Sequence, residues 1–291
     1  MSTLVCRKKK KKYGEKEVLK NVDLTLEKGK IYGLIGRNGA GKTTLLSIMS
    51  AQNPATSGEV TWEGEKVWEN RRALNHICFS RELVPSASGN GVGTMKVKEY
   101  LQAASYYYPN WQKELAKELV EKFELDVKKK IAKLSKGMLS MVTIIVALAS
   151  KAEFTFLDEP VAGLDVVMRE YFYRKLLEEY MDTGRTFVVS THIIEEAANV
   201  FEEVIFLKNK GILLKENTEH LVARCIKVSG PAEAVDAATA GMELHQVETM
   251  GRSKGVTVLL KEGEQIAQSR ELQLQSVNLQ NVFVALCGLE E

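Results

Sequence analysis

The chain has 291 residues, of which 45% are hydrophobic and 27% are charged, and its formal net charge is +2. This ordinary globular composition excludes collagen-like, disordered and disulfide-rich miniprotein classes, and the length predicts about two domains at roughly 150 residues each. The near-balance of charge argues against a protein whose main task is to coat nucleic acid.

The sequence has no closely paired cysteines and no long apolar run, and both features further limit the class of protein. The four cysteines lie far apart without a CxxC pair, which excludes a zinc ribbon and favours free thiols in a reducing cytosol. No apolar run approaches the roughly 18 residues that cross a bilayer, and the basic N-terminus lacks the apolar core of a signal peptide. We therefore expect a soluble chain that reaches a membrane only through a partner or a surface.

The first 70 residues alternate between strand-like and turn-like stretches. Residues 18–26 and 31–35 predict strands, residues 43–49 predict a helix after a glycine-rich loop, and residues 61–68 predict a hairpin element. The lysine run 8–12 favours a solvated edge strand or loop that lysine protects from aggregation, with contact to anionic lipid as the alternative.

Helical spacing replaces this pattern from about residue 90 to 150. Three helices are predicted over 97–108, 112–123 and 140–149, and the third is apolar almost all round and therefore buried.

Strand–helix units follow. Residues 154–157 and 186–189 are continuous apolar runs, as expected of parallel central strands, and residues 169–180 form the helix between them. Residues 204–207 and 212–214 predict an edge hairpin.

The remainder of the chain, 223–291, shows a different order. We expect a strand at 225–229, then helix 231–239, strands 243–249 and 256–260, helix 263–270, strand 272–277 and helix 279–287. This βαββαβ order with a final helix predicts a small ferredoxin-like α+β unit.

A phosphate-binding loop lies between the strand at 31–35 and the helix that follows it. The pattern G-x-x-x-x-G-K-[ST] is matched by Gly36, Arg37, Asn38, Gly39, Ala40, Gly41, Lys42 and Thr43, with Thr44 next. Its glycines let successive backbone N–H groups converge on phosphate oxygens, and the helix adds its positive N-terminal end. Lys42 is expected to reach the β- and γ-phosphates of a bound nucleotide, and the Thr43 hydroxyl to ligate Mg²⁺.

Two carboxylates end the strand at 154–157. We expect Asp158 to face the Mg²⁺ and Glu159 to accept a proton from the attacking water, because parallel sheets place ligands at the carboxyl ends of their strands. His192 lies just past the end of the strand at 186–189, which we expect beside the Asp158 strand. A lone histidine is more often structural than catalytic, but this position also predicts contact with the γ-phosphate.

In these residues the chain resembles the ATP-binding subunits of ABC transporters. Leu134 to Met138 is similar to the family's signature sequence, Gly163-Leu164-Asp165 to its D-loop, His192 to its switch histidine, and Tyr13 to the aromatic that stacks on adenine. The resemblance covers residues 3 to about 220. It implies a P-loop NTPase of α/β class: a mostly parallel central sheet, an antiparallel β subdomain and a helical subdomain at about 90–150.

The resemblance also implies how the subunit works. Ser135 and Gly137 at the start of a helix bind the γ-phosphate held by a second copy, so that two cassettes close head to tail around two ATP molecules. Catalysis then uses Glu159, His192 and Lys42, and Asp165 of the D-loop is among the nucleotide-binding residues that the resemblance implies. The partners implied are a second copy or a sister cassette and separately encoded membrane permease subunits, at the inner face of the cell membrane.

Three departures from the family pattern stand out. Lys136 and Met138 replace the common Gly and Gln of the signature, although Ser135 and Gly137 are kept. The place of the Q-loop glutamine is best aligned with Ser80, whose contact with Mg²⁺ would need a bridging water, and Glu82 is the other candidate. A Gly- and Ser-rich stretch at 86–94 predicts a mobile loop.

The main functional hypothesis is the ATP-hydrolysing subunit of an ABC transporter, with domains at 1–222 and 223–291. Export is favoured over import because the C-terminal unit resembles the extensions of ATPases that serve ABC-2-type exporters. The alternative is a soluble ABC-type ATPase that acts on ribosomes or nucleic acid. It is disfavoured because one cassette is present and the interval between Ser80 and Ser135 is too short for a long coiled coil. No nucleic-acid partner and no metal beyond Mg²⁺ are expected.

Overall fold

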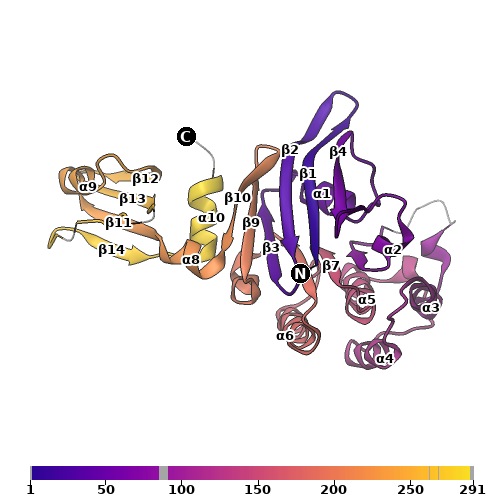
Figure 1. The fold of residues 1–291 in the computed structure, drawn as a ribbon. Coiled ribbons are helices and arrows are strands. Elements are labelled where there is room, and N and C mark those ends of the chain that lie inside the picture. Colours follow the sequence, from indigo (N-terminus) through magenta and orange to yellow (C-terminus); the bar gives the residue numbers. More distant parts are fainter. Residues whose placement is uncertain (1, 85–90, 262, 268, 289–291) are drawn as a thin grey trace.

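The computed structural model describes residues 2–84, 91–261, 263–267 and 269–288, and these form three β-sheets with helices packed around them (Figure 1). The central sheet has six strands in the order β10-β9-β3-β8-β7-β6. Its strands are β3 Ile31–Gly36, β6 Ile77–Ser80, β7 Phe154–Asp158, β8 Thr186–Thr191, β9 Glu203–Lys208 and β10 Gly211–Asn217. All neighbouring pairs are parallel except the β9–β10 hairpin, which confirms the predicted α/β class.

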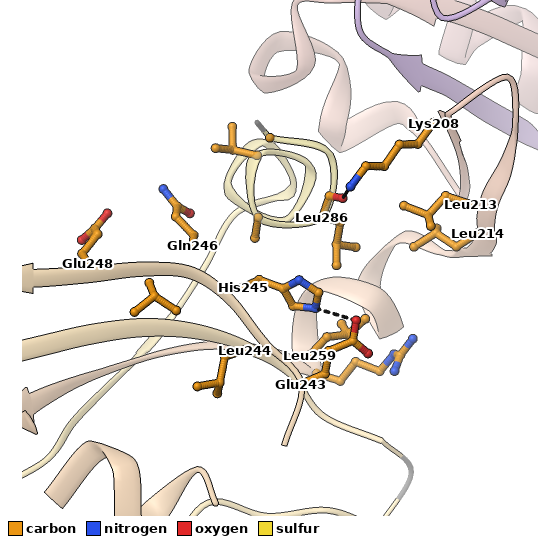
Figure 2. A pocket seen from close by; sticks show the side chains of 15 residues that line it. Lys208, Leu213, Leu214, Glu243, Leu244, His245, Gln246, Glu248, Leu259 and Leu286 are labelled. Carbon is orange, nitrogen blue, oxygen red and sulfur yellow. Dashed lines mark hydrogen bonds and ion pairs between the residues drawn. The ribbon is translucent and has the colours of Figure 1, made fainter. Parts of the chain in front are cut away.

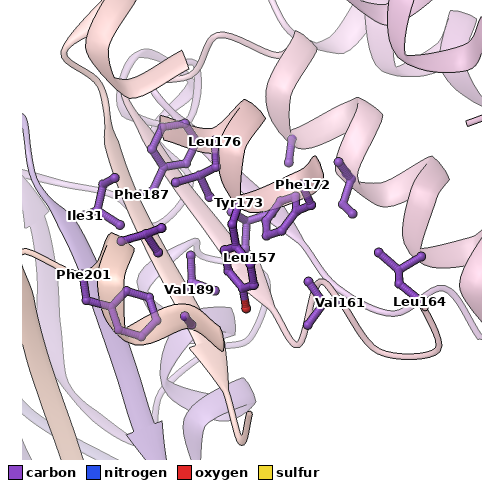
Figure 3. Packing of buried hydrophobic residues seen from close by; sticks show 14 of the residues in the cluster. Ile31, Leu157, Val161, Leu164, Phe172, Tyr173, Leu176, Phe187, Val189 and Phe201 are labelled. Atoms are coloured by element: carbon purple, nitrogen blue, oxygen red, sulfur yellow. The ribbon is translucent and has the colours of Figure 1, made fainter. Parts of the chain in front are cut away.

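Both faces of the central sheet are buried, which explains why its strands are continuous apolar runs. On β7, Phe154 and Phe156 belong to one buried cluster and Leu157 to the other. Figure 3 shows Leu157 close to the side chains that α6 (Val166–Thr183) brings to this face, among them Phe172. Helix α5 (Lys136–Ala149) covers the same face, whereas α1 (Lys42–Met49) packs on the opposite one.

The N-terminal sheet is antiparallel, with the order β2-β1-β4-β5. Its strands are β1 Thr3–Tyr13, β2 Lys16–Glu27, β4 Ser57–Trp62 and β5 Glu65–Lys66. The expectation that lysines 8–12 form a solvated edge strand or loop is wrong, because β1 lies between β2 and β4. Lys9 and Lys11 are buried, and their ammonium groups reach the backbone oxygens of Gly58 and Pro54. Long aliphatic stems allow lysine to occupy such inner positions.

The helical subdomain is inserted between β6 and β7. Helices α3 (Val97–Tyr107) and α4 (Lys113–Lys122) pack with α5, close to the ranges expected from sequence. Of the stretch 86–94, residues 86–90 lie outside the described part of the chain, and Val92–Thr94 form a 3₁₀ turn, η1. The other short elements are α2 Arg71–Leu74, η2 Ile131–Lys133, α7 Ile194–Ala197, η3 Ala198–Val200 and α8 Thr218–Ala223.

The third sheet has the order β12-β13-β11-β14 and is antiparallel throughout, as a ferredoxin-like unit requires. Its elements are β11 Cys225–Pro231, α9 Ala232–Ala238, β12 Leu244–Met250, β13 Ser253–Leu259 and β14 Gln273–Ser276. The helix predicted at 263–270 is wrong for the described residues of that range. Gly263 begins it with φ at +82° in a turn, and Ile266 is the one side chain there within the small core. One apolar anchor is too little to hold a helix of two turns.

The last helix, α10 (Leu279–Cys287), packs with the cassette and also contacts β12 of the third sheet. Leu279, Val282 and Leu286 belong to the large buried cluster that includes α5 and α6, and the Phe283 ring meets Phe206 of β9 edge to face. The third sheet has a separate core around Val228. We therefore propose a domain division in which the accessory unit spans about 225–276 and α10 is part of the cassette.

The structure also describes the state of the cysteines and the length of the apolar helices. All four cysteines are free, as predicted, and all are buried; burial raises the pKa of Cys6 to about 12. Within the described part of the chain, no helix is long and apolar enough to cross a bilayer.

A buried arginine ties α5 to the start of β8. One guanidinium nitrogen of Arg185 lies 2.9 Å from the Leu148 carbonyl oxygen at the end of α5 and 2.9 Å from a Glu179 carboxylate oxygen. Only 4% of the Arg185 side chain is exposed. Cationic groups at a helix C-terminus satisfy its unpaired carbonyls, so this contact fixes the far end of the signature helix.

Replacing Arg185 with methionine is expected to lower the free energy of unfolding by about 2–4 kcal/mol, because Glu179 and the α5 carbonyls lose a buried partner. Urea denaturation followed by circular dichroism measures this loss. The matched control is Arg174→Met, whose side chain is 65% exposed, and whose loss should stay below about 0.5 kcal/mol. Equal losses in the two variants would contradict this account of α5.

Candidate nucleotide site

The phosphate loop connects β3 to α1 and is shaped by glycines. Gly39 and Gly41 have φ of +80° and +109°, a region that residues with a Cβ rarely adopt. A Cβ on Gly36 would lie 2.8 Å from the Leu207 carbonyl oxygen of β9. Helix α1 begins at Lys42, so its N-terminal amides point toward the loop and favour an anion there.

Asp158 at the end of β7 meets the phosphate loop. Its Oδ2 accepts a hydrogen bond of 2.6 Å from the Thr43 hydroxyl, although β8 separates β7 from β3 in the sheet. A carboxylate and a hydroxyl are the hard oxygen donors that Mg²⁺ prefers, so these two residues fit the expected magnesium site.

The three residues predicted to be catalytic lie together. One Glu159 carboxylate oxygen is 3.5 Å from the Lys42 ammonium, and the other is 2.6 Å from the His192 ring nitrogen Nδ1. The Lys42 ammonium also donates to the Gly36 carbonyl oxygen at 2.8 Å. Glu159 therefore bridges the phosphate loop and the residue that follows β8.

Tyr13, at the end of β1, presents its ring to solvent, with 51% of the residue exposed. Its hydroxyl accepts a hydrogen bond from Asn53, just after α1, and the Lys11 ammonium lies 4.6 Å from the ring centre. The start of β2 reaches the phosphate loop, because a Cβ on Gly41 would meet the Leu19 side chain at 2.9 Å. An exposed ring supported on its polar edge suits the predicted stacking on adenine.

The signature and the D-loop pack against each other within one chain. Ser135 caps α5 and accepts the Met138 N–H at 3.3 Å, and Asp165 caps α6 in the same way. A Cβ on Gly137 would lie 2.5 Å from the Gly163 carbonyl oxygen, so only glycine fits this contact. Ser135 and Asp165 are both exposed at this edge.

The structure does not support Ser80 as a magnesium ligand. Its side chain is buried, and its hydroxyl donates to the Thr143 carbonyl oxygen of α5 at 2.9 Å. The short side chain at the end of β6 is thus used for packing on the signature helix. Glu82 lies 3.7 Å from Lys136 of the signature, in an exposed ion pair.

One functional candidate was missed from the sequence. Ser190 precedes the predicted histidine by two residues, yet its hydroxyl donates to the second oxygen of Asp158 at 2.6 Å. In the sequence, the one indication was that Ser190 directly follows the apolar run 186–189. The structure makes Ser190 the register partner of Asp158 on the neighbouring strand.

One cavity is remote from this chemistry. It has a volume of about 970 Å³ and lies between the third sheet, β10 and α10, with leucine walls (Figure 2). Its polar side chains are largely engaged with protein groups: His245 with Glu243, and the Lys208 ammonium with the Leu286 carbonyl oxygen. We interpret this cavity as part of the interface between the accessory unit and the cassette.

A mostly parallel sheet with a glycine-rich phosphate loop, a lysine and paired carboxylates at one edge is typical of P-loop NTPases. The family model described as ABC transporter matches residues 19–162. Three curated relatives agree with it. The ABC transporter ATP-binding protein YtrB of Bacillus subtilis is 26% identical over 94% of both chains. The manganese transport system ATP-binding protein MntB of Listeria monocytogenes is 33% identical over 68% of this chain and 83% of its own. The lantibiotic transport ATP-binding protein SrtF of Streptococcus pyogenes is 30% identical over 73% and 92%.

Solved structures show the same fold. The ATP-binding subunit of an ABC transporter superposes with a TM-score of 0.65 at 22% identity, over 76% of this chain and 92% of the other. A dimeric ATP-binding cassette in a post-hydrolysis state with ADP and Pi gives 0.62 at 25% identity, over 74% and 98%. The chain belongs to the family of ABC transporter ATP-binding proteins, and it is an ATPase.

The glycine contact between signature and D-loop yields a test. Gly137→Ala is expected to lower ATPase turnover at least about 10-fold while leaving ATP affinity nearly unchanged, because the new methyl displaces Gly163 without touching the phosphate loop. Steady-state kinetics and calorimetry measure the two effects. Gly211→Ala, where the nearest atom is 3.7 Å away, is the control and should behave as the wild type. A fully active Gly137→Ala enzyme would contradict the role given to this contact.

Proposed function

We propose that this protein hydrolyses ATP between two copies of its cassette and thereby drives transport through separately encoded permease subunits. The observation that carries the proposal is the position of Glu159, whose carboxylate lies between the Lys42 ammonium and the His192 ring. A carboxylate so placed serves as the general base for an attacking water.

Each residue of the nucleotide site has a separate role in the proposed reaction. The phosphate-loop amides and Lys42 bind the β- and γ-phosphates, and Thr43 and Asp158 hold the magnesium ion, which when bound neutralises charge on the phosphates. Glu159 takes the proton of the water, and His192 orients the γ-phosphate. Tyr13 stacks on the adenine.

The second copy completes the site in this proposal. The exposed cap residue Ser135, together with Gly137, offers a hydroxyl and helix N-terminal amides to an anion. Among the described residues, no hydrogen bond or ion pair connects Ser135 or Gly137 with the phosphate loop of the same chain. Support for pairing also comes from the dimeric cassette structure to which this fold is similar.

The permease is proposed to dock on the groove between α3 and α5. A cavity of about 370 Å³ there is lined by Phe79 and Ser80 of β6, Tyr107 of α3 and Val146 of α5. Tyr107 is 64% exposed, as suits an aromatic anchor for a partner helix. This would place the subunit at the inner face of the membrane.

Export is the proposed direction, and its support is the resemblance of the accessory unit to extensions of exporter ATPases. Manganese and lantibiotics are the cargoes in the names of MntB and SrtF, and they are properties of those proteins. The alternative of a ribosome- or nucleic-acid-directed ATPase has no support among the relatives, which are transport ATP-binding proteins. Transport measured in inverted and right-side-out vesicles that contain the complete transporter decides the direction.

Glu159→Gln is expected to lower ATP turnover by at least about 100-fold, because the amide accepts no proton from water, while ATP binding is kept and the dimer is trapped. Phosphate release and size-exclusion chromatography with ATP measure both. Glu170→Gln, an exposed change on α6, is the control. Wild-type turnover by Glu159→Gln would refute the general-base assignment.

For the docking surface, Tyr107→Asp is expected to reduce the share of the protein that sediments with membranes at least about fivefold, because a charge replaces an aromatic anchor. ATPase activity of the isolated subunit should persist. Met250→Asp, 82% exposed on the accessory unit, is the matched control and should sediment as the wild type does. Equal membrane association of both variants would exclude this groove as the permease site.

A further inference from the structure

Ser190 makes contact with both residues of the carboxylate pair. It is the register partner of Asp158 on the parallel strands β7 and β8, and it is fully buried. Its hydroxyl donates to Asp158 Oδ1 at 2.6 Å and accepts the backbone N–H of Glu159 at 3.1 Å. The Ser190 carbonyl oxygen accepts the same N–H, also at 3.1 Å.

The first contact orients Asp158. Because Ser190 occupies Oδ1 and the Thr43 hydroxyl occupies Oδ2, the plane of the carboxylate is fixed from both sides. Hydrogen bonds to a charged acceptor are the stronger ones, so loss of the Ser190 hydroxyl would leave the carboxylate held from one side only.

The second contact holds the backbone of Glu159. Its φ of +49° lies in the left-handed region, which costs free energy for a residue with a Cβ and persists only where the surroundings impose it. This conformation turns the chain after β7 and directs the Glu159 side chain toward Lys42 and His192. The shared N–H bond to Ser190 is the restraint closest to the strained torsion.

We propose that Ser190 is a positioning residue for ATP hydrolysis. Its hydroxyl sets the plane of the Asp158 carboxylate and stabilises the left-handed conformation that aims Glu159. The inference rests on the proposed roles of Asp158 and Glu159, and it adds a residue that acts through them without touching the nucleotide.

The test compares Ser190→Ala with Ser190→Thr, which keeps the hydroxyl, and with Ser50→Ala. Ser50 is an equally small buried residue whose hydroxyl, among the described residues, donates to the Leu46 and Ser47 carbonyl oxygens of α1. Ser190→Ala should lower kcat about 10–100-fold with ATP affinity in the absence of Mg²⁺ unchanged, as loss of a supporting hydrogen bond at a metal site does. Ser190→Thr should restore at least part of kcat, and Ser50→Ala should leave it unchanged.

Two further readouts separate positioning from a merely structural role. Calorimetry should show that adding Mg²⁺ improves ATP affinity about 10-fold less in Ser190→Ala than in the wild type, because Asp158 is less well oriented. In a Glu159→Gln background, Ser190→Ala should lower the residual turnover by much less than in the wild type, since residues that act through one another are not additive.

The proposal is overturned if Ser190→Ala keeps wild-type kcat and Mg²⁺ response, or if its loss of activity merely follows a loss of folded protein seen by circular dichroism. A Thr variant as inactive as the Ala variant, although folded, also counts against it. Failure of the proposed function is distinguishable, because an active Glu159→Gln enzyme refutes the base assignment whatever Ser190→Ala does. An inactive Glu159→Gln enzyme beside a fully active Ser190→Ala enzyme refutes only this inference.

Discussion

The hydrogen bond between Thr43 and Asp158 is the contact on which the nucleotide site depends. It joins the loop after β3 to the end of β7, two strands that are not neighbours in the sheet. It forms because all strands between them are parallel and end at one edge, so the phosphate loop and the carboxylates arrive at the same level. The buried faces of the sheet keep that edge in register.

Strand β8 both spaces the two strands and positions the carboxylate pair. It separates β3 from β7 in the sheet, its residue Ser190 contacts Asp158, and His192, directly after its end, contacts Glu159. The pair of carboxylates is therefore held from the strand beside it, while Lys42 meets Glu159 from the loop. A rigid buried strand positions side chains more accurately than a loop does, because its backbone is hydrogen-bonded on both sides.

The signature helix connects this edge to the rest of the cassette. Its start packs on the D-loop through Gly137, Ser80 holds its middle, and Arg185 holds its end. The accessory sheet, in contrast, has its own small core, and α10 lies between that sheet and the cassette (Figure 1). Helix α10 also lies near the nucleotide-binding edge, because its Phe283 lines a cavity with Arg37 and His192.

The sequence by itself determined the phosphate loop, the carboxylate pair, the α/β class and most helices, because these depend on local patterns: glycine spacing, continuous apolar strands and helical periodicity. The lysine strand β1, the missing helix at 263–270, the packing role of Ser80 and the contacts of Ser190 were decided only by the tertiary structure. Strand order, burial and the partner of a small hydroxyl arise from residues far apart in the chain, and no local pattern of a single sequence carries that information.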